Sequence, residues 1–445
     1  MNSFKAFNWV TLAAVAGSVL AACQNQPLPQ SLSQVRQLNQ PASSATQVVP
    51  GQMIIKYRSG LRNASAMAAS SLSRIGAQKV SSVGSMAAGM ELVKLPAGQS
   101  AATAAASLQQ NAAIEFAEPV FTVPFPRVMK EDGDTTTPAP ANAPNDPMFN
   151  KQYSHSIAET LAGWAITKGN PKVLVGIVDS GVDITHPDLK GKIVDTFNGA
   201  DNNKDVKDVV GHGTHVAGIA AAMTNNGIGV AGVAAECGIL AVKVSSGDSS
   251  SPSTAGIANG VMWAADHGAA VINLSLGSRV ESKAITEAVK YAMSKNIVVV
   301  AATGNDAQRV MSYPAAVPGV VAVGATDSKD NRARYSNYGP WVSVTAPGSD
   351  ILSTFPLNSN LIGQKEYGSI SGTSMATPFV TGLVALIRSK YPTMPAVMVK
   401  NVLEQSAQDK GKPGFDEEYG HGRVSSGRAL VKAADLMAAS NPASR

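Results

Sequence analysis

Five short, nearly unbroken runs of apolar residues constrain the fold more than any other feature of this sequence. Their positions are 173–178, 239–244, 271–276, 297–302 and 320–323. Runs of this length and composition are typical of strands that are buried on both faces of a parallel sheet. Helical patterns accompany them at 213–223, 254–267, 283–295 and 377–390. Strands that alternate with helices predict an α/β fold, in which helices cover both faces of a parallel sheet.

A smaller unit precedes this domain, at residues 49–123. Its strand patterns fall at 52–57, 77–83, 90–95 and 114–120, and its helical patterns at 61–74 and 100–110. This β-α-β-β-α-β order predicts a ferredoxin-like α+β sandwich. The unit contains no nucleophile motif, metal-ligand cluster or phosphate-binding loop, so we expect the chemistry to lie further along the chain.

The remaining segments have the composition of leader, tether and linker. Residues 1–22 predict a signal peptide, because Lys5 precedes an uncharged apolar run that is too short to span a membrane. Residues 23–48 are rich in Gln, Ser and Pro and predict a tether, whereas the proline-rich stretch 124–144 predicts an exposed linker open to proteolysis. The main domain is then expected at 145–440.

Charge and cysteine content argue against two classes of protein. The net charge is +5 over 445 residues, without a basic cluster, so the sequence gives no sign of nucleic-acid binding. The two cysteines, Cys23 and Cys237, lie in the leader region and the main domain and cannot form a disulfide framework.

Three polar residues stand where predicted elements begin or end. Asp179 follows the first apolar strand, His212 opens a helical pattern, and Ser374 lies just before Pro378, a residue that suits the first turn of a helix. A serine hydroxyl becomes a nucleophile when an imidazole removes its proton and a carboxylate orients that imidazole. Each residue alone has a simpler explanation as a cap or turn, and His212 with His215 could instead form a metal pair.

The sequence windows around these residues resemble a known family. Asp179-Ser-Gly, His212-Gly-Thr-His-Val-Ala-Gly and Gly372-Thr-Ser-Met-Ala-Thr-Pro are similar to the three signature blocks of the subtilases, and the likeness over residues 145–434 is greatest to the thermitase-like branch. The resemblance implies a subtilisin-like fold and a serine endopeptidase. Ser374 would be the nucleophile, His212 the general base and acid, and Asp179 its orienting partner. Asn305 and the backbone N–H of Ser374 would form the oxyanion hole, and His215 would be structural.

The same resemblance implies where a peptide substrate binds. The segment Asn273–Gly277 matches the family's substrate-binding edge, to which a peptide would add as a strand. The implied substrate-binding residues are Ser275, Leu276, Gly277, Ala302, Gly304 and Ser250. Their small, uncharged side chains suggest a broad preference for apolar residues before the scissile bond.

Calcium is the cofactor that the resemblance implies. The first site would consist of Asp146, Asp188, Thr224, Asn226, Ile228 and Val230. Carboxylate, amide and main-chain oxygens are the ligands that Ca²⁺ prefers. A weaker second site would consist of Asn198, Asp201, Asn203 and Asp205, although its two asparagines and the nearby Lys207 depart from the family pattern.

Two features near the N-terminus bear on maturation. The stretch Val49–Tyr57 is similar to the start of subtilase propeptides, which implies an inhibitory propeptide at 49–123 and a maturation cut in the linker. Leu20-Ala-Ala-Cys23 resembles the lipobox of bacterial lipoproteins, which implies lipidation of Cys23; ordinary cleavage after Ala22 is the alternative. The predicted enzyme is therefore a self-inhibited, secreted or cell-envelope precursor whose mature form is monomeric.

Two other functions remain open at this point. One is a surface lipoprotein that has the subtilase fold and binds partners without turnover, which would require a defect in the triad or oxyanion hole. The other is a zinc hydrolase that uses His212 and His215. The first alternative predicts no hydrolysis, and the second predicts inhibition by chelators without reaction toward a fluorophosphonate.

Overall fold

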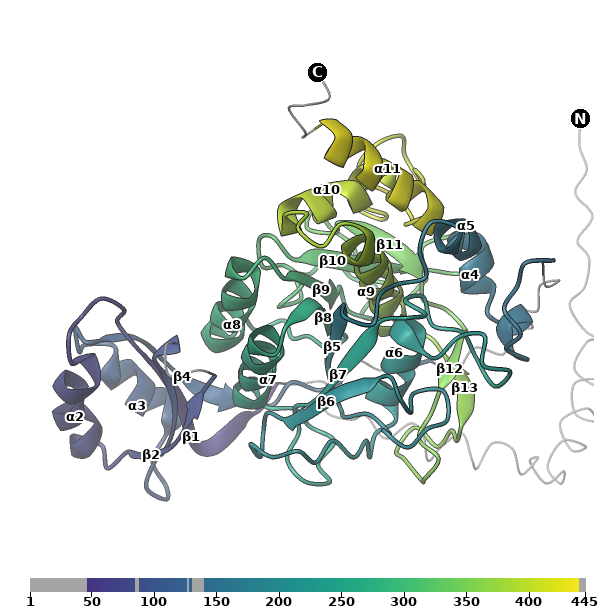
Figure 1. Ribbon diagram of the computed structural model, residues 1–445. Coiled ribbons are helices and arrows are strands. Elements are labelled where there is room, and N and C mark those ends of the chain that lie inside the picture. Colours follow the sequence, from purple (N-terminus) through teal and green to yellow (C-terminus); the bar gives the residue numbers. More distant parts are fainter. Residues whose placement is uncertain (1–45, 85–87, 126–127, 130–139, 440–445) are drawn as a thin grey trace, which may run out of the picture. The chain divides into compact units, whose positions relative to one another are not determined.

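A computed structural model describes residues 46–84, 88–125, 128–129 and 140–439 (Figure 1). The predicted signal peptide, Cys23 and most of the predicted tether lie outside the described residues. Within those ranges, no helix has the length and apolar character required to cross a membrane.

A seven-stranded sheet forms the centre of the larger domain. Its strands are β5 (Leu174–Asp179), β6 (Ile193–Asn198), β7 (Gly238–Lys243), β8 (Ala269–Leu274), β9 (Val298–Ala302), β10 (Val321–Thr326) and β11 (Val344–Pro347). The order across the sheet is β11-β10-β9-β8-β5-β7-β6, and all neighbouring strands are parallel. The five predicted strands are present, and the parallel α/β fold is confirmed. The two strands that the sequence did not predict, β6 and β11, are the edges of the sheet.

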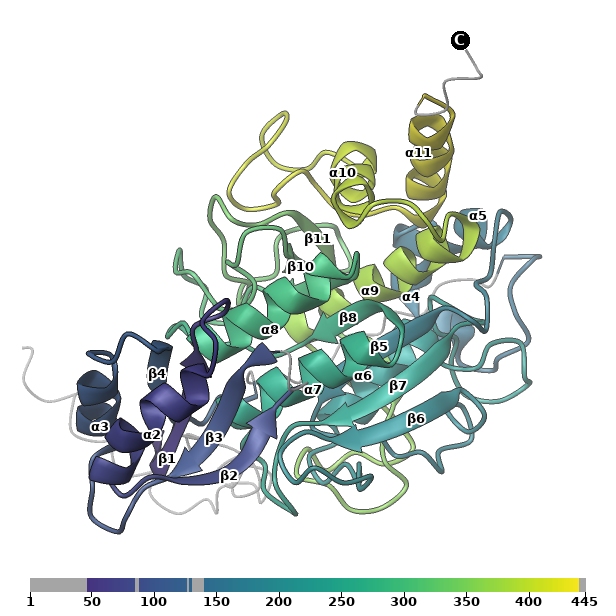
Figure 2. The same ribbon diagram turned by 60° about the vertical axis from the view of Figure 1, so that its left-hand side comes forward.

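Helices cover both faces of this sheet (Figures 1 and 2). The helices α6 (His212–Ala221) and α9 (Thr373–Lys390) pack on one face, and α7 (Thr254–Asp266) and α8 (Lys283–Ser294) on the other. Consecutive strand residues alternate between the two cores: Val175 and Ile177 pack with α6 and α9, whereas Val178 packs with α7. Burial on both faces explains why these strands are apolar throughout.

The remaining elements of the larger domain surround this core. Two short helices, α4 (Tyr153–Ile157) and α5 (Thr160–Trp164), follow the 3-10 turn η2 (Phe149–Lys151). A hairpin of β12 (Ile351–Thr354) and β13 (Tyr367–Ile370) packs on α6, and the chain ends with α10 (Ala396–Ser406) and α11 (Ser426–Ala439).

The small N-terminal unit has the predicted ferredoxin-like order. Its elements are β1 (Val48–Tyr57), α2 (Ala64–Arg74), β2 (Gln78–Val83), β3 (Met90–Lys94), α3 (Ala101–Leu108) and β4 (Ile114–Phe121). The strand order is β2-β3-β1-β4, and every pair is antiparallel. Strand β1 begins at Val48, within the stretch that we predicted as tether.

The small unit packs one face of its sheet on the larger domain. Along β1, Met53 and Ile55 belong to the core beneath α2 and α3, whereas Ile54 belongs to the core that contains α7 and α8. The alternation of side chains along a strand places these two sets on opposite faces. At the edge of the contact, Lys56 pairs with Glu287 of α8 at 2.5 Å.

Helix α9 begins earlier than predicted. We expected Pro378 in its first turn, but the helix starts at Thr373 and Pro378 lies inside it. A proline at this position cannot donate to the carbonyl four residues earlier, which belongs to Ser374. The Ser275 hydroxyl donates to that carbonyl at 2.9 Å, and this bond compensates for the missing helical one.

Candidate active site

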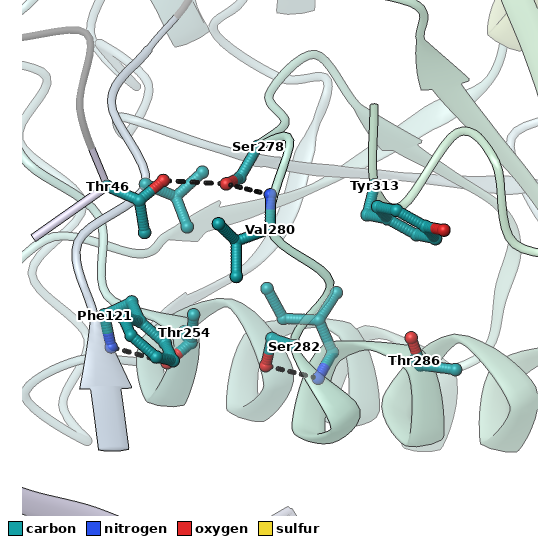
Figure 3. A pocket seen from close by; sticks show the side chains of 10 residues that line it. Thr46, Phe121, Thr254, Ser278, Val280, Ser282, Thr286 and Tyr313 are labelled. Atoms are coloured by element: carbon teal, nitrogen blue, oxygen red, sulfur yellow. Dashed lines mark hydrogen bonds between the residues drawn. The ribbon is translucent and has the colours of Figure 1, made fainter. Parts of the chain in front are cut away.

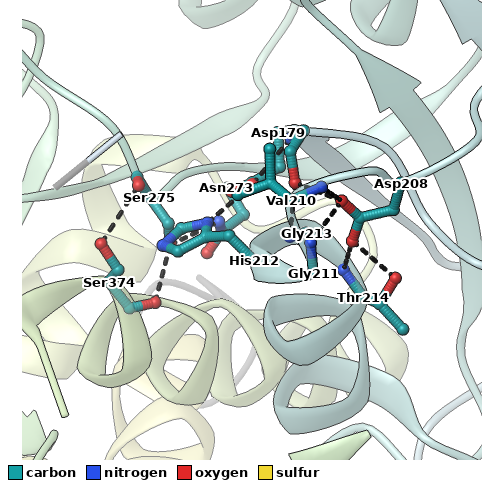
Figure 4. A network of polar contacts seen from close by, with 11 residues as sticks. Asp179, Asp208, Val210, Gly211, His212, Gly213, Thr214, Asn273, Ser275 and Ser374 are labelled. Carbon is teal, nitrogen blue, oxygen red and sulfur yellow. Dashed lines mark hydrogen bonds and ion pairs between the residues drawn. The ribbon is translucent and has the colours of Figure 1, made fainter. Parts of the chain in front are cut away.

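The three predicted catalytic residues come from elements that meet at the carboxyl edge of the sheet, where ligand sites of parallel sheets form. Asp179 ends β5, His212 begins α6, and Ser374 is the second residue of α9, which packs against α6. All three side chains are buried. The His212 Nδ1 and Asp179 Oδ1 atoms are 2.7 Å apart, and Figure 4 shows this pair together with Ser374.

The Ser374 hydroxyl donates to the Ser275 carbonyl at 3.1 Å. His212 Nε2, the ring nitrogen that does not bond Asp179, has no hydrogen-bond partner among the described residues. The Ser374 hydroxyl and His212 Nε2 are therefore not hydrogen-bonded to each other in this structure. Such a gap before substrate binds is common in catalytic pairs.

The two histidines of α6 have opposite electrostatic environments. Burial of His212 disfavours its charged form, but the carboxylates of Asp179 and Asp208 outweigh that effect and raise its pKa above the ordinary value. Burial lowers the pKa of His215 to about 3, and its Nε2 bonds to the Gly368 carbonyl at 3.1 Å. His215 is therefore neutral at ordinary pH and is engaged with the backbone rather than with His212.

The amide oxygen of Asn305 caps the start of α9. Its Oδ1 accepts hydrogen bonds from the Thr373 backbone N–H at 2.9 Å and from the Thr373 hydroxyl at 2.8 Å. Its Nδ2 lies close to Gly372, since a Cβ built on Gly372 would be only 3.1 Å from this nitrogen. Asn305 thus pairs the Thr373 N–H and lies beside the turn that carries Ser374.

The predicted substrate-binding residues differ in exposure. Ser275 and Leu276 follow β8 and are fully buried, and Ala302 ends β9. Gly304 has a φ of 100°, and a Cβ there would lie 2.5 Å from Asn337 Nδ2, so glycine is required. The predicted rim residue Ser250 is exposed, and the main-chain contacts on that rim are instead made by Pro252 and Ser253.

The end of the small unit runs into this region. Thr122 forms a β-bridge with Ser253, and the Val123 N–H donates to the Pro252 carbonyl at 2.8 Å. The Phe125 ring lies against the His212 ring, with centroids 5.3 Å apart. Met129 and Ser371 exchange backbone hydrogen bonds of 3.0 and 2.9 Å. Phe125, in the stretch that we predicted as exposed linker, therefore contacts a predicted catalytic residue, and Met129 pairs with Ser371; residues 126–127 and 130–139 lie outside the described residues.

A small pocket beside these contacts is closed by both parts of the chain (Figure 3). Thr46, just before β1, places its hydroxyl 2.7 Å from that of Ser278, and the Phe121 N–H donates to the Thr254 hydroxyl at 3.1 Å. The small unit is thus hydrogen-bonded to both sides of this pocket.

The residues of the first predicted calcium site lie together, and their oxygens accept hydrogen bonds within the site: the Asn225 and Asn226 N–H groups donate to Asp146 at 2.7 and 3.2 Å. Burial and the nearby negative charge of Asp188 raise the pKa of Asp146, as expected for carboxylates that lack a counter-ion. Val230 N–H donates to Asp188 at 2.9 Å, so the loop that holds Thr224, Asn226 and Ile228 closes around this carboxylate. Ligation by the Asn226 side-chain oxygen would require its amide to turn over, because its nitrogen now donates to Asp188 at 2.8 Å.

The second predicted calcium site stays a prediction, and its oxygens likewise accept hydrogen bonds from the protein. Asn198 Oδ1 accepts the N–H groups of Ala200 and Asp201 at 3.0 and 3.1 Å, and Asp201 accepts the Gly247 N–H at 2.8 Å. Asn203 and Asp205 each accept an N–H two residues further along the chain. These oxygens face hydrogen-bond donors rather than a shared centre. Across the described ranges, no three His, Cys, Asp or Glu side chains group in a way that could hold a metal.

One residue beside the site was not predicted from sequence. Asp208 is a buried carboxylate four residues before His212, and it belongs to the network in Figure 4. Its sequence neighbourhood is polar and charged, which made a solvated loop the simpler expectation. Of the five donors that surround it, one is the Ser180 hydroxyl just after β5, and the other four come from residues 210–214, which follow Asp208 in the chain.

Comparisons with known proteins agree with this geometry. The model of the Subtilase family, Peptidase_S8, matches residues 170–422, and that of the Fervidolysin N-terminal prodomain matches residues 36–119. The chain is 43% identical to thermitase of Thermoactinomyces vulgaris over 64% of this chain and 99% of that protein. It is 40% identical to a thermophilic serine proteinase of Bacillus sp. (strain AK1), over 73% of this chain and 75% of the relative.

Solved structures give the same result. The structure of fervidolysin from Fervidobacterium pennivorans, described as a keratinolytic enzyme related to subtilisin, superposes with a TM-score of 0.77 and 28% identity. The match covers 86% of this chain and 61% of the fervidolysin chain. A protease from Pseudoalteromonas arctica PAMC 21717 superposes with a TM-score of 0.61 and 30% identity, over 66% of this chain and all of that one.

Proposed function

Because this chain belongs to the subtilase family of serine peptidases, we propose that it hydrolyses peptide bonds through a triad of Ser374, His212 and Asp179. The observation that carries the proposal is the buried 2.7 Å bond between His212 and Asp179, at the start of a helix that packs against the helix bearing Ser374. A carboxylate, an imidazole and a hydroxyl in this arrangement are the parts of a nucleophilic acyl-transfer site.

The reaction follows from the roles of these groups. His212 Nε2 removes the proton of Ser374 as its oxygen attacks the substrate carbonyl, while Asp179 holds Nδ1–H and stabilises the imidazolium. The amide nitrogen of Asn305 and the backbone N–H of Ser374 then donate to the oxyanion. His212 gives the proton to the leaving amine, which departs with the C-terminal part of the substrate. Water, activated by His212, then hydrolyses the ester of Ser374.

The substrates proposed are proteins or peptides with apolar residues before the scissile bond. The predicted walls around Gly277, Ala302 and Gly304 carry no charge. The chain's own segment 122–125, which includes Val123 and Phe125, supports this choice, because it is apolar and pairs with the rim at Pro252 and Ser253.

Labelling with a fluorophosphonate tests this function. We expect one label per chain, attached to Ser374 and found by peptide mapping, together with loss of hydrolysis of an unstructured protein such as casein. Labelling should be unaffected by zinc chelators. A zinc hydrolase would instead lose activity with the chelator and take no label, and a binding protein without turnover would show neither hydrolysis nor label.

The small unit is proposed to act as the inhibitory propeptide, at residues 49–123, with the peptidase domain at 145–440 and the maturation cut in 124–144. Support comes from the Phe125 ring, which covers His212, and from Glu118 of β4, which docks on the first turn of α8. Glu118 accepts the backbone N–H groups of Lys283 and Ala284 at 2.9 and 3.0 Å and the Ser282 hydroxyl at 2.7 Å. A carboxylate is stabilised at this end of a helix, so it fixes the propeptide on the catalytic domain.

Calcium is proposed to bind at Asp146 and Asp188, with Thr224, Asn226, Ile228 and Val230 as further ligands. Because calcium would bind the folded chain and neutralise two close carboxylates, its removal should destabilise the enzyme. We expect a chelator to lower the Tm of the labelled, inactive enzyme by about 5–10 °C. Asp188→Asn should show a low Tm that no longer responds to chelator, whereas Asp195→Asn on the exposed edge of β6 should respond as the wild type does. An unchanged wild-type Tm would refute the site.

Secretion and lipidation at Cys23 are also proposed, on the strength of the signal-like stretch 1–22 and its Leu-Ala-Ala-Cys ending. A diacylated cysteine would tether the precursor to a membrane surface. Because the predicted cut lies after the propeptide, it would free the peptidase domain, proposed as a monomer, from this anchor. Mature enzyme that remains with the membrane after the cut would overturn this coupling of maturation to release.

A further inference from the structure

Asp208 is a second buried carboxylate beside the proposed triad, and bond cleavage as described above does not use it. The side chain is 5% exposed. Its oxygens accept hydrogen bonds from five donors: the Ser180 hydroxyl, the backbone N–H groups of Val210, Gly211 and Thr214, and the Thr214 hydroxyl, at 2.7–3.1 Å. Burial raises the pKa of Asp208, but every partner is a donor, so the hydrogen bonds favour the ionised carboxylate. The bonds fix the chain on both sides of His212.

Ser180 connects this carboxylate to Asp179. Its hydroxyl donates to Asp208 at 2.8 Å and accepts the Gly213 N–H at 2.8 Å, while its backbone N–H donates to Asp179 Oδ1 at 2.8 Å. That same Asp179 oxygen receives His212 Nδ1–H. One serine therefore joins the end of β5 to the first turn of α6. The Ser180 hydroxyl donates its hydrogen bond to Asp208, so the lone pairs of its oxygen remain available to accept the Gly213 N–H.

We propose that Asp208 and Ser180 are positioning residues, which hold Asp179 and His212 in register and, in the case of Asp208, add a second negative charge that favours the imidazolium. The inference rests on the proposed function, since it concerns the efficiency of that triad. Gly213 leaves no room for the loop to shift, because a Cβ there would lie 2.1 Å from the Gly181 carbonyl. The contact between β5 and α6 is thus tight, so a small displacement of Ser180 would also displace the imidazole of His212.

The charged and titratable groups around His212 can be named on each neighbouring element. Asp179 at the end of β5 and Asp208 before α6 both favour its charged form, and neutral His215 lies one turn along α6. Lys243 ends the adjacent strand β7, but its ammonium donates to the carbonyls of Lys207 and Gly247. The first turn of α9 carries Ser374 but no charged side chain. Removal of the Asp208 charge therefore leaves Asp179 as the one carboxylate in this set.

Kinetics of three mature variants, counted by fluorophosphonate titration, test the proposal. Asp208→Asn should lower kcat about 10–100-fold with KM within about twofold, because the nucleophile–base geometry worsens while substrate contacts stay. Its acidic limb of kcat/KM should move to lower pH by about half to one unit, since His212 must be neutral to act as base and the charge that raises its pKa is gone. Ser180→Ala should lower kcat but leave the limb in place, because it removes the bridge and keeps the charge.

Asp416→Asn is the matched control. Asp416 also accepts three backbone N–H groups, from Lys412, Glu418 and Tyr419, each at 2.8 Å, but it lies in the loop before α11, outside this network. Its replacement should affect stability alone. If Asp208→Asn alters kcat and the limb no more than Asp416→Asn does, the positioning role is refuted.

A second measurement keeps the proposal testable if Asp208→Asn fails to mature or if the chain proves to be no peptidase. In the full chain with Ser374→Ala, the hydrogen-bonded Nδ1 proton of His212 resonates far downfield, and its NMR titration reports the pKa without any turnover. Adding Asp208→Asn should lower that pKa by about half to one unit. If the Nδ1 proton signal and the pKa of His212 are the same in both chains, the inference is overturned, whatever the activity of the enzyme.

Discussion

Replacement of Ser374 by alanine is expected to leave the precursor whole and to lower kcat by about 10⁶-fold, the size of the loss known for the nucleophile of subtilisin. The change removes the one hydroxyl that His212 could activate, whereas the fold should persist, because the bond lost, from Ser374 to the Ser275 carbonyl, is single and neutral. We would express residues 23–445 with calcium and compare intact mass and N-terminal sequence with the wild type. Wild-type chains should begin within about 125–146.

Ser389→Ala is the matched control for this experiment. Ser389 lies near the other end of the same helix, and its hydroxyl donates to the Ala385 carbonyl at 2.7 Å. This variant should mature as the wild type does. If the Ser374→Ala chain is cut at the same place, another peptidase performs the maturation, and the self-processing proposal is wrong. If neither chain is cut, inhibition by the propeptide is not relieved under these conditions, or the function is binding without turnover.

The central fold could be predicted because strands that are buried on both faces have a recognisable apolar sequence. Strands β5 and β7–β10 lie between two helical layers, so their apolar runs are unbroken and easily recognised. The edge strand β6, Ile-Val-Asp-Thr-Phe-Asn, is partly exposed and mixes polar with apolar residues, so its pattern resembles a loop. The start of α9 was misplaced because the usual position of proline was outweighed by a tertiary contact, the Ser275 hydroxyl on the Ser374 carbonyl.

The site could be predicted only where short motifs recorded it. Asp179, His212 and Ser374 each sit in a recognisable window, and the structure brings these windows to one edge of the sheet. Phe125 is positioned by its contact with His212, which is distant in sequence, and its own neighbourhood suggests a proline-rich linker. Asp208 accepts four of its five hydrogen bonds from residues 210–214, and only Ser180 belongs to another segment. Both predicted calcium sites stay predictions: their oxygens accept backbone N–H groups in this structure, and such bonds leave no pattern in the sequence.

Asp179→Asn exchanges one carboxylate oxygen for an amide nitrogen. After Ser374→Ala, it is the substitution that we expect to lower kcat most. Asp179 Oδ1 accepts two N–H groups, from Ser180 and from His212, whereas Oδ2 has no partner among the described residues. An asparagine would therefore keep its oxygen toward the two donors and place its nitrogen at the empty position. We infer that the tautomer of His212 is preserved, and that what is lost is the negative charge beside the imidazolium.

The expected result is a fall in kcat that is smaller than about 10⁴-fold, because the 10⁴-fold loss found for this change in a serine-protease triad includes trapping of the wrong histidine tautomer. The pKa of His212 should fall, because the larger of its two raising influences is removed, so the acidic limb of kcat/KM should move to lower pH. KM should change little, since Asp179 is buried behind the imidazole. Asp195→Asn, on the exposed edge of β6, should leave both the rate and the limb unchanged. A large loss of rate without movement of the limb would mean that misplacement of His212, rather than loss of charge, is the cause, and the preserved tautomer would be refuted.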